Sequence, residues 1–326
     1  MLDFTILVVP GSYASSVALT LDILSAAVAM APGVGASPPR WRVYVAGDGP
    51  AQLSNGLSIA ARPLPQRMRA DSSIWIVPGL GINTPKAAAL RLAQPAVRRA
   101  AKALKAHADA GGTVAASCSA VFLLQSAGLL QDRKVTTTWW LASHLQTLEP
   151  RCVVDANRMV IADGQVVTAG AALAQTDLML ALLRMKFGPA LVDAVSRVLL
   201  IDGRQAQAPF IVPAMLASGN ELIAKITARI AAALPHPPSV AELAVELCVS
   251  ERTLARRVRA ATGRSTLDLF QSVRLNRARV LLESTRTSVD EVAAQVGYAD
   301  ATALRRLMRK VAGATPSQFR LRACRD

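Results

Sequence analysis

The sequence predicts an α/β N-terminal domain, a parallel sheet with helices on both faces, followed by an all-α C-terminal domain with two helix-turn-helix units. Short β-branched runs alternate with alanine-rich helical stretches over residues 1–188, and no strand pattern follows. A Pro-His-Pro-Pro segment at 235–238 interrupts the helical remainder, because consecutive prolines stop a helix. We therefore expect an α/β domain at 1–188, a helical connector at 189–234 and a helical domain at 235–326.

The strands of the first domain are predicted from runs that are apolar throughout, as strands buried on both faces of a sheet should be. Two helical patterns lie between and after them, Lys86 to Ala108 and Ala171 to Phe187. Each pattern ends before glycines or a Gly-Pro pair, which stop helices. The expected strands are FTILVV at 4–9, WRVYVA at 41–46, IWIV at 74–77 and TVAAS at 113–117.

Composition favours a folded protein with a polyanionic partner. Apolar residues make up 52% and charged residues 18% of the 326 residues, which excludes the disordered class and suffices for two cores. Lys and Arg number 37 against 22 Asp and Glu, a formal net charge of +15. This excess favours nucleic acid as the partner, ahead of an anionic membrane surface.

The four cysteines, at 118, 152, 248 and 324, form no CxxC pair. The sequence therefore predicts no metal site, no disulfide framework and no bound cofactor, and the last three cysteines are expected in packing or surface positions. Asp3 stands where a signal peptide would carry positive charge, and no uninterrupted apolar stretch reaches about 18 residues. We expect a cytoplasmic protein that does not span a membrane.

The first helix-turn-helix pattern begins at Ser239, which opens a capping box before a short apolar helix,. Ser250 is placed to cap a second helix, in which Leu254, Val258 and Ala261 share one face,. The residues that must then project outward are Arg252, Ala255, Arg256 and Arg259,. This outer face is strongly cationic.

The same pattern recurs from Ser288. Asp300 is placed to cap the outer helix of this second unit, and Leu304 and Met308 form its buried face,. A long helix at 266–283 joins the two units. The accessible face of the outer helix carries Thr302, Arg305, Arg306 and Arg309. Because an α-helix fits the major groove and arginine both reads guanine and neutralises phosphate, one chain would carry two groove readers.

These residues closely resemble the AraC-type DNA-binding domain over about 239–322. The motif residues that occur in order are Gly297-Tyr298, Asp300, Arg306, Gly313, Thr315-Pro316 and Phe319-Arg320. Apolar residues replace the phenylalanines frequent in that family at Val258, Leu304 and Met308. The resemblance implies base contacts from Arg252, Ala255 and Arg256 of the first unit and from Ala301, Thr302 and Arg306 of the second.

In the α/β half, the string TVAASCSAVFLLQSAGLL places Cys118 between a buried strand and a helix. Enzymes expose nucleophiles at such turns, because a helix N-terminus lowers a thiol pKa and supplies oxyanion-binding amides. The pattern resembles the PfpI and class I glutamine amidotransferase-like superfamily, which has a flavodoxin-like fold. Together with VPGLG at 77–81 and TTTW at 136–139, it resembles the sensor domain of GlxA-family regulators, which precedes an AraC-type tail.

A cysteine hydrolase needs a base beside its thiol. The family often has histidine just before the tryptophan of the TTTW segment, where this chain has Thr138. His107 and His236 lie elsewhere in the pattern, and His144 remains a candidate replacement,. Cys118 has three open roles: a small packing residue at a tight turn, a ligand-pocket residue, or a nucleophile. The predicted ligand-binding set is Cys118, Ser119, Thr138, Trp139 and Asp22.

Together these features predict a sequence-specific DNA-binding transcriptional regulator with a non-catalytic amidotransferase-like domain. Double-stranded DNA is the expected partner, an unidentified small-molecule effector is expected in the α/β domain, a homodimer is expected, and RNA polymerase is a candidate partner. Two alternatives remain open. One is a hydrolase or amidase that uses Cys118, and the other is an architectural nucleoid protein, which leaves the α/β domain without a role.

Overall fold

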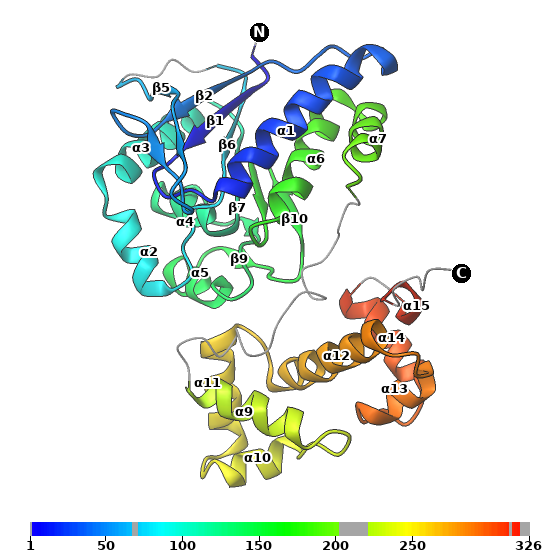
Figure 1. Ribbon diagram of the computed structural model, residues 1–326. Coiled ribbons are helices and arrows are strands. Elements are labelled where there is room, and N and C mark those ends of the chain that lie inside the picture. The colour runs from blue at the N-terminus through cyan, green and yellow to red at the C-terminus, as the bar shows by residue number, and fades with distance from the viewer. Residues whose placement is uncertain (1, 67–70, 202–220, 313–314, 320–326) are drawn as a thin grey trace. The chain divides into compact units, whose positions relative to one another are not determined.

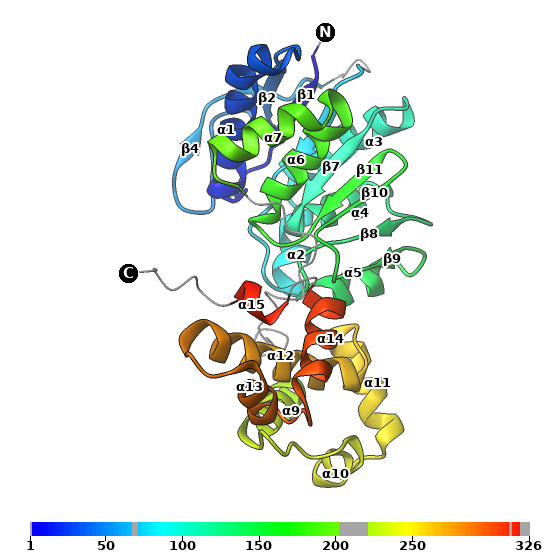
Figure 2. The same cartoon turned by 90° about the vertical axis from the view of Figure 1, so that its right-hand side faces the viewer.

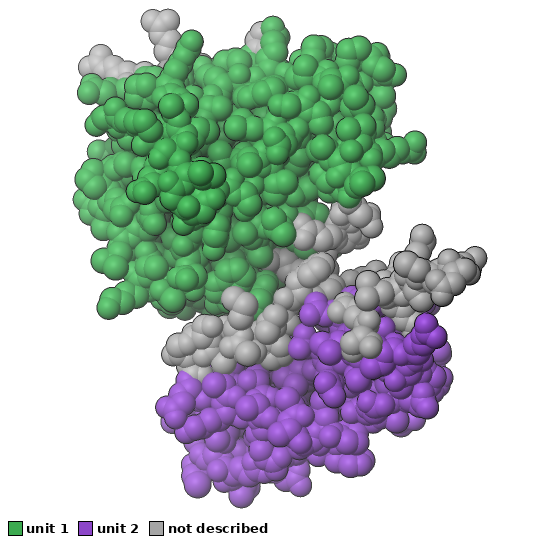
Figure 3. Space-filling model, viewed as in Figure 1, with its two compact units in different colours: residues 1–205 green, residues 206–326 purple. Residues whose placement is uncertain are grey.

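The computed structural model describes residues 2–66, 71–201, 221–312 and 315–319. The chain forms two compact units, Met1–Gln205 and Ala206–Asp326 (Figure 3). Unit 1 contains the α/β architecture and unit 2 is helical, as the sequence predicts. Arg320 and Cys324 lie outside the described residues, as does Gly313.

A seven-stranded sheet with the order β10-β11-β7-β6-β1-β2-β5 forms the centre of unit 1 (Figure 1). All neighbouring pairs are parallel except β10 and β11, which are antiparallel. Every residue of β1, β6 and β7 is buried, which explains why these strands read as uninterrupted apolar runs,. The strands are β1 (Phe4–Val8), β2 (Trp41–Val45), β5 (Arg62–Pro63), β6 (Ile74–Val77), β7 (Val114–Ser117), β10 (Val160–Asp163) and β11 (Val166–Ala169).

Helices cover both faces of this sheet (Figure 2). On one face α1 (Ala14–Met30), α6 (Ala174–Phe187) and α7 (Pro189–Val198) pack together over Phe4, Ile6 and Val8. The other face is covered by helices that contribute Leu104, Phe122 and Leu145 to a second core. Those helices include α3 (Pro95–Asp109), α4 (Val121–Ser126) and α5 (Ala142–Leu148), with α2 (Pro85–Leu92) beside them.

Short elements complete unit 1. They are the 3-10 turns η1 (Ala31–Val34) and η2 (Cys118–Ala120), and the small sheets β3 (Ala51–Gln52) with β4 (Ser58–Ile59) and β8 (Lys134–Val135) with β9 (Val153–Val154). The sequence pattern predicts one helix from Lys86 to Ala108, but the structure has two, because α3 begins at Pro95. Proline has no N–H to continue a helix and disfavours helical geometry in the preceding residue.

The N-terminal helix is apolar enough that it must be considered as a candidate membrane span. Residues Ala14–Val34 are long and apolar enough, by length and composition alone, to cross a membrane. In the structure this segment is α1 and η1, and α1 packs against α6 and α7. Val17, Ile23, Leu24 and Ala27 of this segment are buried in the core of unit 1, and the segment does not indicate a membrane protein.

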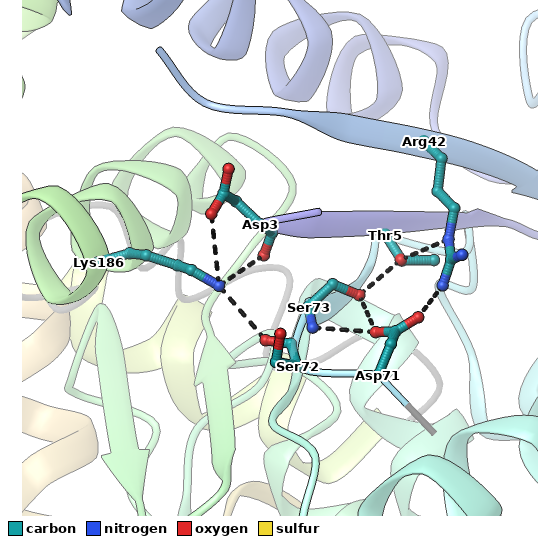
Figure 4. Close-up of polar contacts among 7 residues, drawn as sticks. All are labelled: Asp3, Thr5, Arg42, Asp71, Ser72, Ser73 and Lys186. Atoms are coloured by element: carbon teal, nitrogen blue, oxygen red, sulfur yellow. Dashed lines mark hydrogen bonds and ion pairs between the residues drawn. The ribbon is translucent and has the colours of Figure 1, made fainter. Parts of the chain in front are cut away.

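A polar cluster ties the amino ends of the strands together (Figure 4). Arg42 of β2 forms an ion pair with Asp71, and its Nε donates to Thr5 Oγ1 at 3.0 Å. The Ser73 amide donates to Asp71 Oδ1 at 2.9 Å, and the hydroxyl oxygens of Ser73 and Thr5 are 2.7 Å apart. This cluster links β1 and β2 to the segment that leads into β6.

A second tie at the same end of the sheet comes from α6. Lys186 Nζ donates to the carbonyl oxygens of Asp3, at 3.2 Å, and Ser72, at 3.3 Å (Figure 4). Its ammonium also lies 3.7 Å from the Asp3 carboxylate. The C-terminal turn of α6 is thereby attached to the start of β1 and to the segment before β6.

Unit 2 is built around its longest described helix, α12 (Thr266–Ser284), which contacts α9, α11, α13 and α15. Capping boxes begin α10, α12 and α13, so these helices start where serine and an acidic residue three positions later predict,. The remaining helices are α9 (Glu221–Ala232), α10 (Val240–Glu246), α11 (Glu251–Thr262), α13 (Val289–Gln295), α14 (Ala301–Ala312) and α15 (Pro316–Phe319).

The expected connector at 189–234 is not a separate part of the structure. Its first helix, α7, packs on α1 and α6 of unit 1, and its last helix, α9, packs on α12 of unit 2. Residues 202–220 lie outside the described ones. The compact units divide at residue 205 rather than 235, because apolar packing of α9 outweighs the proline-rich punctuation that follows it.

Candidate nucleic-acid interface and the Cys118 site

The outer helix of the first helix-turn-helix unit is α11. The Ser250 hydroxyl accepts a hydrogen bond from the Thr253 amide at 3.2 Å and caps the helix, as predicted. Leu254 and Val258 are fully buried, whereas Ala261 is only half-buried. The predicted outward residues Arg252, Ala255, Arg256 and Arg259 are all exposed.

The second unit repeats this arrangement in α14. Asp300 Oδ1 accepts a hydrogen bond from the Ala303 amide at 2.8 Å, which caps the helix as predicted. Leu304 and Met308 are fully buried in a core that also contains Val292. On the opposite side Thr302, Arg305, Arg306 and Arg309 are exposed.

Ala301 corrects the predicted contact set. Its side chain is 2% exposed and belongs to the core shared with Val292 and Ala293 of α13. Position 301 is therefore unable to present its methyl group to a base. The resemblance placed it among the base contacts, but the first turn of α14 is oriented by packing against α13.

The arginines on these outer faces carry uncompensated charge. Arg252, Arg256, Arg259, Arg305, Arg306 and Arg309 form no ion pair within the part of the chain that the structure describes. Other arginines of unit 2 do have partners; Arg229, for example, forms two hydrogen bonds to Glu246, at 2.9 and 2.8 Å. An exposed guanidinium without an intramolecular carboxylate is available to phosphate and base edges.

Arg274 of α12 is a positioning residue that the sequence motifs do not indicate. Its guanidinium carbon lies 5.2 Å from the centre of the Tyr298 ring, within cation–π range. Burial raises the pKa of Tyr298, and the hydrogen bond and charge of Arg274 oppose that rise. This contact holds the turn of the second unit on α12. No local spacing could have shown it, because the two residues belong to different elements.

Cys118 lies at the sharp turn between β7 and α4, with a positive φ of 54°. Its amide donates to the Gly170 carbonyl at 2.6 Å, and its carbonyl accepts from Thr137 Oγ1 at 2.7 Å. Gly79 packs so closely that a Cβ there would lie 3.1 Å from the Cys118 Cβ. The geometry of a nucleophile turn is therefore present, and three other segments enclose it.

The enclosure determines the chemistry of the thiol. Cys118 is 0% exposed, and this burial raises its pKa to about 11, although hydrogen bonds from Ser119 and Thr138 oppose the rise. A thiolate is the reactive form of cysteine. The side chain is thus held as a neutral thiol near neutral pH.

Four of the five predicted ligand-binding residues are buried in unit 1, and the fifth is exposed. Ser119, Thr138 and Trp139 are at most 5% exposed, like Cys118. The Ser119 hydroxyl accepts from the Ile82 amide at 3.2 Å. Asp22 is exposed, because Ser16, Thr20, Ile23 and Ala27 form the buried face of α1 and residue 22 lies on the opposite side,. Asp22 is thus separate from the buried residues of the predicted set.

Three buried oxygens in unit 1 lack ordinary hydrogen-bond partners. Ser117 Oγ and Gln175 Oε1 have none among the described residues, and Thr138 Oγ1 has none besides the thiol. Ser117 is adjacent to Cys118, and Gln175 Nε2 donates to Thr20 Oγ1 at 2.7 Å. Buried polar atoms are nearly always paired with protein or water. These oxygens are therefore candidates to contact a small polar molecule.

The histidines do not supply a base to the thiol. The His144 ring stacks on Phe122 with centroids 5.7 Å apart, and burial lowers its pKa. His107 stacks on Trp75 in the first half of β6, whereas Cys118 follows the last residue of the parallel strand β7. Neither histidine is among the groups that influence the pKa of Cys118. Thr138, the residue at the expected histidine position, has no basic nitrogen.

Comparison with known proteins supports both the α/β domain and the helix-turn-helix domain. Residues 45–185 match the DJ-1/PfpI family, and residues 243–322 match a helix-turn-helix domain. The HTH-type transcriptional regulator CdhR of Pseudomonas aeruginosa is 27% identical over 284 residues, which cover 86% of this chain and 81% of that protein. The HTH-type transcriptional regulator GlxA of Rhizobium meliloti is 26% identical over 208 residues, 63% of this chain and 64% of that protein.

A solved structure supports the fold of unit 1. A Vibrio parahaemolyticus protein aligns over 61% of this chain and all of its own, with 20% identity and a TM-score of 0.51. Both matched domains occupy the places that the sequence motifs indicated. The chain thus contains a DJ-1/PfpI-family domain followed by an AraC-type helix-turn-helix domain.

Proposed function

We propose that this protein is a DNA-binding transcriptional regulator in which α11 and α14 enter successive major grooves. The observation that carries the proposal is the pair of capped outer helices, each with exposed arginines that lack carboxylate partners. Two such helices on one chain suit sites about one helical turn apart, roughly 34 Å. The transcriptional regulators CdhR and GlxA, to which the chain is similar, support the same conclusion.

Selection from a random duplex library with the full chain tests this function. We expect one enriched motif with two half-sites. We also expect a steep fall in affinity as salt rises, because the arginine and lysine side chains release counterions when they bind DNA phosphates. Fluorescence anisotropy on the enriched duplex and on a scrambled duplex measures both. Equal affinity for the two duplexes would leave an architectural role, and a flat salt response would contradict the arginine interface.

We further propose that a small polar effector binds beside Cys118 and that this domain is not catalytic. Ser117 Oγ, Gln175 Oε1 and Thr138 Oγ1 would be satisfied by such a molecule. The effector must have different affinities for the conformation that binds DNA and for the conformation that does not, because only such a difference shifts the equilibrium between them. A thermal-shift screen of small polar metabolites, with Thr138→Val as the comparison, tests the site.

The nucleophile turn of Cys118 favours one alternative, a cysteine hydrolase or amidase. The raised thiol pKa and the absence of a histidine among the groups acting on it argue against that activity. Turnover of ester or amide substrates that disappears in Cys118→Ala, with DNA binding intact, would establish the alternative.

We also propose a cytoplasmic location, a homodimer on DNA and contact with RNA polymerase. In vivo crosslinking tests each of these.

A further inference from the structure

Unit 2 contains a groove between α9, α12 and α13 that the DNA-binding function does not use. Its volume is about 850 Å³, within the range of small-molecule sites. It exists because α9 docks on α12 through Ile223, Ile226 and Ile230, which are fully buried. The residues of α9 that line the groove are small: Ala224, Thr227, Ala228 and Ala231.

Most of the described residues that line the groove are apolar, and Arg277 is the cation among them. Val273 and Val280 of α12 lie opposite the alanines, and Leu234 closes one side. Arg277 also lines it, is exposed, and has no carboxylate or hydrogen-bond partner within the ranges described. Its neighbours differ, since Arg274 contacts Tyr298 and Arg279 donates to Asn276 Oδ1 at 3.3 Å.

We propose that this groove binds a small amphipathic carboxylate, with its apolar part against the α9 alanines and its carboxylate on Arg277. A guanidinium forms its strongest hydrogen bonds with a carboxylate, often in a bidentate manner. The amides of Asn276 and Gln295 also line the groove, and they can donate to the remaining carboxylate lone pairs. A neutral apolar molecule cannot form this charge-assisted bond with Arg277.

The groove borders the segment that positions the second helix-turn-helix unit. Leu234 and Pro235 line it, and the Pro235 carbonyl oxygen is packed against Gly297 in the turn before α14. A bound carboxylate therefore contacts the element that supports this turn. The site is distinct from Cys118, which lies in unit 1.

Titration of the full chain with cyclohexanecarboxylate and with cyclohexanecarboxamide, followed by calorimetry, tests the proposal. The two probes have the same shape and differ in charge. We expect saturable binding of the carboxylate and affinity at least about tenfold weaker for the carboxamide. Arg277→Gln should remove this difference, whereas Arg257→Gln, another exposed arginine of unit 2, should preserve it.

A second pair of variants locates the site. Ala228→Trp fills the groove from an exposed position of α9 and should abolish binding, while Ala232→Trp, exposed on the same helix outside the groove, should not. Equal binding of the two probes, no saturable binding, or full binding by Ala228→Trp would each overturn the proposal. These readouts contain no DNA, so their failure leaves the proposed regulatory function untouched.

Discussion

The carbonyl oxygen of Pro235 occupies the space where Gly297 would carry a side chain. A Cβ built on Gly297 would lie 2.2 Å from that oxygen, and Gly297 has a φ of +82°. Pro235 precedes the first helix-turn-helix unit, and Gly297 lies in the turn of the second. The segment that leads into the first helix-turn-helix unit is therefore packed against the turn of the second. Only glycine permits this distance.

Gly297→Ala should therefore destabilise unit 2 more than backbone strain alone predicts. Gly111→Ala is the matched comparison, because Gly111 also follows a helix with a φ of +85° and has no atom within 4 Å of its would-be Cβ. The left-handed conformation costs about 1 to 2 kcal/mol at either position, and the clash adds to it at 297. Far-UV circular dichroism during thermal unfolding follows the helices of both units, so the transition of unit 2 is the one that tryptophan fluorescence does not report.

All four tryptophans, at 41, 75, 139 and 140, belong to unit 1. Their fluorescence therefore reports the Gly111→Ala effect separately from the unfolding of unit 2. Equal losses of stability for the two variants would mean that the Pro235 contact relaxes without cost.

Arg256→Ala and Arg306→Ala should each weaken binding to the selected duplex by about 1 to 3 kcal/mol, if these guanidinium groups contact base edges. Arg257→Ala is the control, because Arg257 is exposed on α11 but lies about 100° around the helix from Arg256,. Anisotropy on the selected and scrambled duplexes separates the contributions. A loss that is equal on both duplexes would assign the residue to phosphate.

Asp71→Asn should reduce the stability of unit 1 by about 1 to 3 kcal/mol near neutral pH, because it leaves Arg42 without its carboxylate. Burial alone would raise the pKa of Asp71, but hydrogen bonds from Ser73 and the charge of Arg42 hold it below its usual value. This stabilisation is present above the unfolded-state pKa and disappears as pH falls through the folded-state pKa.

The difference between wild type and Asp71→Asn should accordingly shrink below about pH 4, where the unfolded carboxylate gains its proton. Urea unfolding followed by tryptophan fluorescence measures this difference across pH. A gap that stays constant down to low pH would assign the effect of Asp71 to packing rather than charge.

Iodoacetamide at pH 8 should modify Cys248 well before Cys118. Cys248 is exposed and Cys118 is buried, and a pKa of about 11 leaves about one Cys118 thiol in a thousand ionised at this pH,. Peptide mass spectrometry over time measures both sites, with Cys248→Ser as the control. Modification of Cys118 at the rate of Cys248 would restore the nucleophile hypothesis.

Much of the helical architecture could be predicted because its determinants are local. Ser239, Ser250 and Asp300 cap helices through bonds to amides only three residues away, so their spacing was sufficient evidence. The edge hairpin of β10 and β11 was missed. Its strands have four residues each and mixed burial in β10, so their pattern is too short to identify alone.

The sequence by itself determined the two-domain organisation, the buried strands and the arginine faces of α11 and α14, because periodicity and capping act within a few residues. Only the tertiary structure decided the environment of Cys118, the outward position of Asp22, the burial of Ala301 and the division at residue 205. Each of these depends on segments distant in the chain. Gly79 packs against the Cys118 side chain, Gly170 binds its amide, α13 covers Ala301, and α12 packs against α9. Burial depends on which of these surfaces meet.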